Sequence, residues 1–164
     1  MLWRIALRIL IHISSELIFL KTSIDEAQER GWINEGLLAT DDLSEALSCC
    51  DLVMIATPVP VVPDYFCLIA ENDFAGVVTD TCSTKAIVSQ QAKRILPHPE
   101  KYIPGHPMAG SEKSGIEAAR EDLFQGAHWV CVPDEQRLLK TMRICMKCLQ
   151  VLVLAWCRFL EIPT

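Results

Sequence analysis

Asp51-Leu-Val-Met-Ile-Ala-Thr-Pro58 is the stretch that decides the fold of this 164-residue chain. Its apolar residues follow one another without polar residues between them, which is typical of a strand buried on both faces. Both faces of a parallel sheet are buried because helices cover them. Thr57 and Pro58 end the strand, since proline has no amide hydrogen to offer the sheet. The stretch therefore predicts an α/β fold.

Helices and strands are predicted to alternate on the C-terminal side of this strand. Apolar residues at helical spacing, or in short β-rich runs, indicate helices at 62–70 and 85–95 and strands at 77–80, 102–103 and 129–132. A further helix is expected after Gly115, with Leu123 and Phe124 on its apolar face. The fold class that follows is α/β, with a doubly wound, mainly parallel, Rossmann-like sheet.

The N-terminal part of the chain shows the same alternation with weaker signals. The patterns predict helices at 2–12, 23–30 and 41–50 and a short strand at 17–20. Ser23 and Asp41 are residue types that cap helices, and Gly31 favours a helix end.

The composition excludes several classes of function. Of the residues, 51% are apolar and 22% are charged, as in soluble globular proteins. The formal net charge is −6 and no run of Lys or Arg forms a basic stripe, so no nucleic-acid partner is expected. Charged residues interrupt the apolar N-terminus, and the apolar stretch 149–160 is too short to cross a bilayer. We expect no membrane span and a cytoplasmic protein.

The eight cysteines are expected to be reduced thiols. Cys49 and Cys50 are adjacent, and three others lie within apolar or strand-like runs. Cys145-Met-Lys-Cys148 has the spacing of zinc ligands, but no second pair of cysteines or histidines accompanies it. We therefore interpret this pair as two cysteines on a helix face and predict no metal site.

Three polar loops each follow a predicted strand. They are Thr57-Pro58, Asp80-Thr-Cys-Ser-Thr-Lys85 and Gly105-His106. Parallel strands place their carboxyl ends along one rim of the sheet, where ligands bind in such folds. His106, Ser83 and Thr57 are therefore expected to meet in one cleft.

His106 is the candidate general base. Its neighbours, Gly105 and Pro107, fix the backbone, and an imidazole titrates near neutral pH. It is therefore suited to accept a proton from a substrate hydroxyl while hydride leaves the same carbon. The alternative is a loop histidine that is hydrogen-bonded for structure alone. Ser83 is expected to hold the imidazole in the right tautomer, with Asp80 and Lys85 as cap and scaffold groups around the loop. Alternatively, Ser83 only stabilises the turn.

The polar loop after His106 is the candidate entrance for a charged substrate. Ser111 and Glu112 lie between Gly110 and Gly115, in a loop suited to gate or orient a ligand. Alternatively, Ser111 or Ser114 only caps the following helix.

Four segments together resemble a known family. In order they are Ala56-Thr-Pro58, Thr79-Asp-Thr-Cys-Ser-Thr-Lys85, Gly105-His-Pro-Met-Ala-Gly-Ser-Glu-Lys-Ser-Gly115 and Leu123-Phe124. They are similar to the prephenate/arogenate dehydrogenases of tyrosine biosynthesis. The resemblance is strong over residues 51–133, weaker over 24–50 and poor elsewhere.

The resemblance implies an oxidoreductase that uses NAD or NADP. Such an enzyme oxidises the ring hydroxyl of prephenate or arogenate, and the ring carboxylate leaves as carbon dioxide. The resemblance makes His106 the catalytic histidine and Ser83 the serine that supports it. Ser111 and Glu112 match positions at the substrate entrance, and Thr57 and Pro58 match the loop beside the cofactor. Full-length relatives are implied to be homodimers.

The chain departs from the family where the cofactor pyrophosphate is bound. Family members begin with a strand and a GxGxxG turn, whereas no glycine precedes Gly31 here. We therefore expect the first strand and the glycine turn to be missing. Lys21, Thr22 and Ser23 stand where an acidic residue binds the ribose of NAD, so Thr22 and Ser23 are expected cofactor contacts that favour NADP.

The expected domain organisation is an incomplete nicotinamide-dinucleotide-binding domain over 1–133. Residues 134–164 are its divergent helix-strand end, and the family's helical dimerisation domain is expected to be absent. Two alternatives remain: a non-catalytic fragment or pseudoenzyme that serves as a binding or assembly module, and a related hydroxyacid dehydrogenase.

Overall fold

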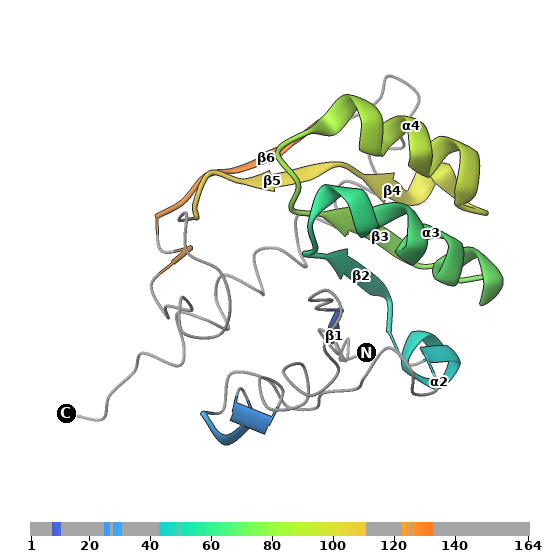
Figure 1. Ribbon diagram of the computed structural model, residues 1–164, viewed down its shortest axis with the longest axis horizontal. Helices are drawn as coiled ribbons and strands as arrows, with labels where there is room; N and C mark the ends of the chain where they lie inside the picture. Colours follow the sequence, from blue (N-terminus) through green and yellow to red (C-terminus); the bar gives the residue numbers. More distant parts are fainter. Residues whose placement is uncertain are drawn as a thin grey trace, which may run out of the picture.

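A computed structural model of the chain describes residues 8–10, 25–26, 28–30, 43–48, 50–110, 123–124 and 126–132. These residues contain a four-stranded parallel sheet and a separate two-stranded ribbon (Figure 1). The parallel sheet has the order β1 (Arg8–Leu10), β2 (Leu52–Ile55), β3 (Val77–Asp80), β4 (Tyr102–Ile103). The parallel sheet predicted from the apolar run at residues 51–58 is thus confirmed.

Two helices connect the strands β2, β3 and β4. A 3-10 turn, η1 (Val59–Val61), leads into α3 (Val62–Glu71), and α4 (Lys85–Ile95) follows β3. A second 3-10 turn, η2 (Pro99–Lys101), precedes β4. The helices α3 and α4 lie side by side along the sheet (Figure 1). Strand β3, helix α4 and strand β4 have the bounds that the sequence predicts, and α3 is one residue longer.

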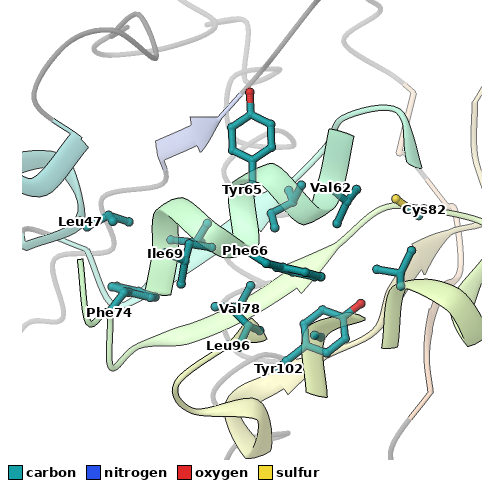
Figure 2. Packing of buried hydrophobic residues seen from close by; sticks show 14 residues of the cluster. Leu47, Val62, Tyr65, Phe66, Ile69, Phe74, Val78, Cys82, Leu96 and Tyr102 are labelled. Carbon is teal, nitrogen blue, oxygen red and sulfur yellow. The ribbon is translucent and has the colours of Figure 1, made fainter. Parts of the chain in front are cut away.

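The core lies between these helices and the sheet. Phe66 of α3 is fully buried and meets the ring of Tyr102 edge-on, with the ring centroids 5.5 Å apart (Figure 2). Val78 from β3 and Val88 from α4 are buried in the same cluster. Burial of this kind stabilises a fold by about 25 cal/mol for each Å² of apolar surface removed from water. The packing fixes the carboxyl ends of β2, β3 and β4 relative to one another.

The chain leaves the parallel sheet at Pro104. It continues as β5 (Gly105–Pro107), which pairs antiparallel with β6 (Trp129–Cys131) and places His106 opposite Val130. The amide of Val132 donates to the carbonyl of Pro104 at 3.0 Å. His106 therefore lies within a short strand of this ribbon, just beyond the end of β4, where the sequence places a free loop.

Two helix predictions are wrong in the described residues. Arg8–Leu10 form strand β1 instead of part of a helix at 2–12, because they supply a parallel partner for the free edge of β2. A strand therefore precedes β2 in the chain and pairs with it, although we expected the first strand of the fold to be missing. Leu123 and Phe124 lie in a turn instead of a helix, and Phe124 packs against Trp129 with ring centroids 6.4 Å apart.

The remaining predicted elements are partly described. Helix α2 (Leu43–Ser48) lies inside the predicted 41–50, and residues 25–26 and 28–29 are helical, as predicted for 23–30. The expected strand at 17–20 and the cysteine pair at 145–148 fall outside the described residues. None of the helices in the described ranges is both long and apolar enough to cross a membrane.

Candidate active site at the carboxyl edge of the sheet

Three loops meet where β2, β3 and β4 end. The amide of Thr81 donates to the carbonyl of Ile55 at 3.0 Å, which ties the loop after β3 to the end of β2. The thiol of Cys82 lies 3.8 Å from the carbonyl oxygen of Thr57. On the other side, the ring of His106 contacts the carbonyl oxygen of Thr81. The loops that the sequence expected to converge therefore do so, as the carboxyl ends of parallel strands require.

His106 is held through one nitrogen of its ring. Its Nδ1 lies 3.0 Å from the carbonyl oxygen of Thr81, and the residue is half-buried. A carbonyl only accepts hydrogen bonds, so Nδ1 must carry the hydrogen in this contact. In the neutral imidazole, Nε2 is then the nitrogen that can accept a proton. The geometry leaves His106 prepared to act as a base through Nε2.

The contact corrects one detail of the sequence prediction. We expected the Ser83 hydroxyl to set the tautomer of His106, but the main chain of Thr81 occupies Nδ1. The physical reason is the bend of the chain after β3, which brings this carbonyl to the imidazole. Ser83 itself is exposed in the same loop. Its part in the site stays a prediction.

Asp80 is a fully buried carboxyl group at the site. Its side chain has no exposed surface, and it ends strand β3. Oδ1 accepts the amide of Cys82 at 2.8 Å and an ion-paired hydrogen bond from Nζ of Lys85, while Oδ2 accepts the hydroxyl of Tyr102 at 2.5 Å. A buried carboxylate is tolerated where partners of this kind replace water.

Lys85 joins two of the converging loops. Its Nζ donates both to Asp80 and to the carbonyl of Gly105, the residue before His106. The side chain of Lys85 is only 16% exposed, so the ammonium group is largely withdrawn from water. The scaffold role predicted for Asp80 and Lys85 is confirmed by these contacts.

Gly105 is a glycine because of close packing. A Cβ at this position would lie 2.7 Å from Nε1 of Trp129 and 2.9 Å from the carbonyl oxygen of Asp80. Both distances are shorter than real Cβ contacts, and the carbonyl is a backbone group that cannot rotate away. The missing side chain therefore allows the strand of His106 to approach the end of β3.

Cys82 is a poor candidate for a nucleophile. Burial raises the pKa of its thiol from 9.0 to about 11, and the nearby negative charge of Asp80 acts in the same direction. The thiolate is the reactive form of cysteine. The thiol therefore stays protonated at neutral pH and serves as a packed apolar group.

Thr57 presents a polar atom that lacks a partner within the described part of the chain. The residue is 7% exposed, and its Oγ1 is buried there without a hydrogen bond. Leaving a buried hydroxyl unsatisfied costs about 1–3 kcal/mol. A ligand group at the rim would satisfy it. Pro58, beside it, is exposed.

Four predicted site residues lie outside the described residues, namely Thr22, Ser23, Ser111 and Glu112. Sequence reasoning also missed two contacts that the structure provides. The carbonyl of Thr81 carries no sequence signal, because every residue has one. The hydroxyl of Tyr102 had a weak signal, since a tyrosine inside a buried strand needs a partner for its OH.

Comparison with known proteins gives consistent matches. The chain matches the family described as prephenate dehydrogenase, nucleotide-binding domain, over residues 16–153. A prephenate dehydrogenase of Lactococcus lactis is 33% identical over 120 residues, covering 71% of this chain and 33% of that protein. One from Bacillus subtilis is 38% identical over 89 residues, covering 51% of this chain and 23% of that protein. The chain thus spans about a third or less of the length of these relatives.

Solved structures show the same likeness. The crystal structure of prephenate dehydrogenase from Aquifex aeolicus in complex with hydroxyphenyl propionate and NAD+ has a TM-score of 0.67 and 25% identity, covering 78% of this chain and 44% of that one. The Synechocystis arogenate dehydrogenase has a TM-score of 0.67 and 25% identity, covering 80% and 45%. The Rossmann-like fold class predicted from the sequence is confirmed.

Proposed function

The chain belongs to the prephenate dehydrogenase family, and on that premise we propose that it supplies the cofactor-binding and proton-accepting part of an NAD(P)-dependent oxidoreductase. The reaction proposed is the oxidative decarboxylation of prephenate or arogenate in tyrosine biosynthesis. The observation that carries the proposal is the contact of His106 Nδ1 with the carbonyl of Thr81, because it leaves Nε2 as a proton acceptor at the carboxyl edge of a parallel sheet.

The proposed step divides the work between cofactor and protein. A nicotinamide cofactor, when bound, would supply the hydride acceptor for the carbon that carries the ring hydroxyl. His106 takes the hydroxyl proton at Nε2, while Nδ1–H stays bonded to Thr81 and shares the positive charge that develops on the ring. The bond to the ring carboxylate then breaks, its electron pair enters the ring, and carbon dioxide leaves. The products are an aromatic ring, carbon dioxide, reduced cofactor and a protonated His106.

The described residues fit the nicotinamide end of the cofactor. The buried Oγ1 of Thr57 has no partner among them, and it follows β2 on the rim where His106 also lies. A carboxamide group offers both a donor and an acceptor to such a hydroxyl. We assign Thr57 and Pro58 to the nicotinamide side of the site.

The other predicted contacts complete the proposal. Ser83, exposed on the loop after β3, is assigned to the substrate hydroxyl or to His106. Ser111 and Glu112 are assigned to the substrate entrance, and Thr22 and Ser23 to the adenosine ribose. An acidic residue at this place favours the free ribose hydroxyls of NAD, whereas the hydroxyl groups of Thr22 and Ser23 suit the 2′-phosphate of NADP better. We therefore propose to test NADP as well as NAD as the cofactor.

Titration of the chain with each cofactor tests the proposal. Binding of NAD or NADP is expected to raise the melting temperature, since a ligand that binds only the folded state stabilises it. If both cofactors leave the melting temperature and the tryptophan fluorescence unchanged at millimolar concentration, a catalytic role of this chain is excluded. Incubation with prephenate or arogenate and analysis of the aromatic product then distinguishes the two substrates from an aliphatic hydroxyacid.

A further inference from the structure

Lys85 makes a contact that a loop scaffold alone does not need. Its Nζ donates to the carbonyl of Gly105, twenty residues further along the chain, as well as to Asp80 in its own loop. Gly105 directly precedes His106, and its carbonyl belongs to the peptide unit that carries the amide of His106. The ammonium group therefore contacts the peptide bond that sets the position of the catalytic ring.

The position of Lys85 is itself fixed. Asp80 is fully buried, and the hydroxyl of Tyr102 and the amide of Cys82 hold its carboxylate in one orientation. Tyr102 belongs to β4, the strand that leads to Gly105. The carboxylate, the ammonium group and the carbonyl of Gly105 thus form a chain of hydrogen bonds from the end of β3 to β5.

We infer that Lys85 is a positioning residue for His106, acting through the carbonyl of Gly105, and that Asp80 holds Lys85 in place. The two hydrogen bonds of Lys85 keep β5 at the distance from β3 at which Nδ1 of His106 reaches the carbonyl of Thr81. When this link is broken, β5 is free to move from the end of β3. The ring then loses its bond to Thr81, and Nε2 no longer remains the unprotonated nitrogen.

The test measures the tautomer of His106 directly. Nitrogen-15 chemical shifts of the imidazole distinguish the Nδ1–H from the Nε2–H form at a pH where the ring is neutral. A His106→Gln variant assigns the signal among the four histidines. The Nδ1–H form is expected to predominate in the natural chain and to become the minor form in Lys85→Met. Lys85→Arg keeps the charge and the donors, so it is expected to retain more of the Nδ1–H form than Lys85→Met.

A matched control is available in Lys101. Its Nζ also donates to a backbone carbonyl, that of Ala75, at 2.5 Å, but this carbonyl precedes β3 at the opposite end of the sheet. Lys101→Met is expected to leave the tautomer of His106 unchanged. An unchanged tautomer in Lys85→Met, or an equal change in Lys101→Met, would overturn the inference.

A second variant covers the case in which Lys85→Met does not fold because it leaves the charge of Asp80 buried alone. Asp80→Asn/Lys85→Met removes both charges together, and the Nδ1–H form is expected to decrease in it as well. An unchanged tautomer in the folded double variant contradicts the inference.

The inference rests on the proposed function only in treating Nε2 of His106 as the proton acceptor. The tautomer measurement needs neither substrate nor cofactor, so it stands or fails separately from turnover. Where turnover is measured, Lys85→Met is expected to lower kcat while the KM for the cofactor changes little, because Lys85 contacts the strand of the base.

Discussion

At the scale of single residues, the main chain decides which nitrogen of His106 is basic. The carbonyl of Thr81 accepts from Nδ1, so Nε2 is the nitrogen of the neutral ring that carries no hydrogen. A side-chain partner for the same nitrogen would have been visible in the sequence, and Ser83 was the expected one. The backbone partner became visible only through the fold.

Replacement of His106 tests the proposed chemistry. His106→Asn removes the basic nitrogen but keeps a polar side chain of similar reach, so kcat for prephenate or arogenate is expected to fall by about two to four orders of magnitude. The dissociation constant of the cofactor is expected to change little. His98→Asn is the control. His98 lies just before η2, which leads into the start of β4, whereas the site lies beyond the other end of this strand. Normal turnover in His106→Asn would remove His106 from the mechanism.

Because of Cys82, the stability of the protein is expected to decrease at alkaline pH. Burial raises the pKa of the folded thiol to about 11, whereas a cysteine thiol in the unfolded chain has the ordinary pKa of 9.0. Between these values the unfolded chain loses the proton and the folded chain keeps it, so the free energy of unfolding falls as the pH rises from 9.0 to about 11.

Comparison with a variant isolates this effect from other groups. The difference in the free energy of unfolding between the natural chain and Cys82→Ala is expected to narrow over the same pH interval, as measured by urea unfolding. Cys67→Ala, at an exposed free cysteine, is the control for the loss of a thiol from the chain. A difference for Cys82→Ala that stays constant over this pH interval would show that the folded Cys82 thiol titrates like the unfolded one.

At the scale of elements, an aromatic contact helps to hold α3 against the sheet. Phe66 is fully buried between α3 and the sheet, against the ring of Tyr102. Phe66→Ala is expected to lower the free energy of unfolding by about 3–5 kcal/mol, because it leaves a cavity where the helix meets the strand. Urea unfolding measures the loss.

The control lies on the exposed side of α4. Ile87 is 55% exposed, and Ile87→Ala is expected to change the free energy of unfolding by about 0.5 kcal/mol or less. A comparable loss in the two variants would mean that Phe66 does not hold α3 to the sheet.

The elements differ in how well their sequences predict them. The bounds of β3, α4 and β4 follow from local signals, because apolar runs and helical spacing are continuous there. Strand β1 cannot be predicted from local signals, because its pairing with the edge of β2 joins residues that are over forty positions apart in the sequence. Likewise, the loops of the site were predictable from strand ends, but the link from Lys85 to Gly105 depends on how β5 turns away after Pro104.

At the scale of the whole molecule, the described part divides into a covered sheet and a ribbon at its edge. In the parallel sheet, β2 and β3 each have a neighbour on both sides, and all of their residues are buried. Among the described residues the ribbon consists of two strands, and Val130 in β6 is 43% exposed. Amide hydrogen exchange is therefore expected to be slowest in β2 and β3 and faster in β6.

Mass spectrometry of peptides from the exchanged protein measures this order. Peptides that contain Val53 or Val78 are expected to keep their amide hydrogens longest, and a peptide that contains Val130 is expected to lose them first. Addition of cofactor is expected to slow exchange in the loops after β2 and β3. Equal rates in sheet and ribbon would contradict the division of the molecule into two parts.

The contact between His106 and the carbonyl of Thr81 determines which mutations the site can tolerate. A carbonyl survives every substitution at position 81, so a change of that codon does not remove the chemical group that the imidazole contacts. What it can lose is the shape of the loop, which depends on Asp80, Lys85 and the small size of Gly105. Substitutions at these three neighbours are therefore expected to disturb the position of the proposed base more than a substitution at position 81.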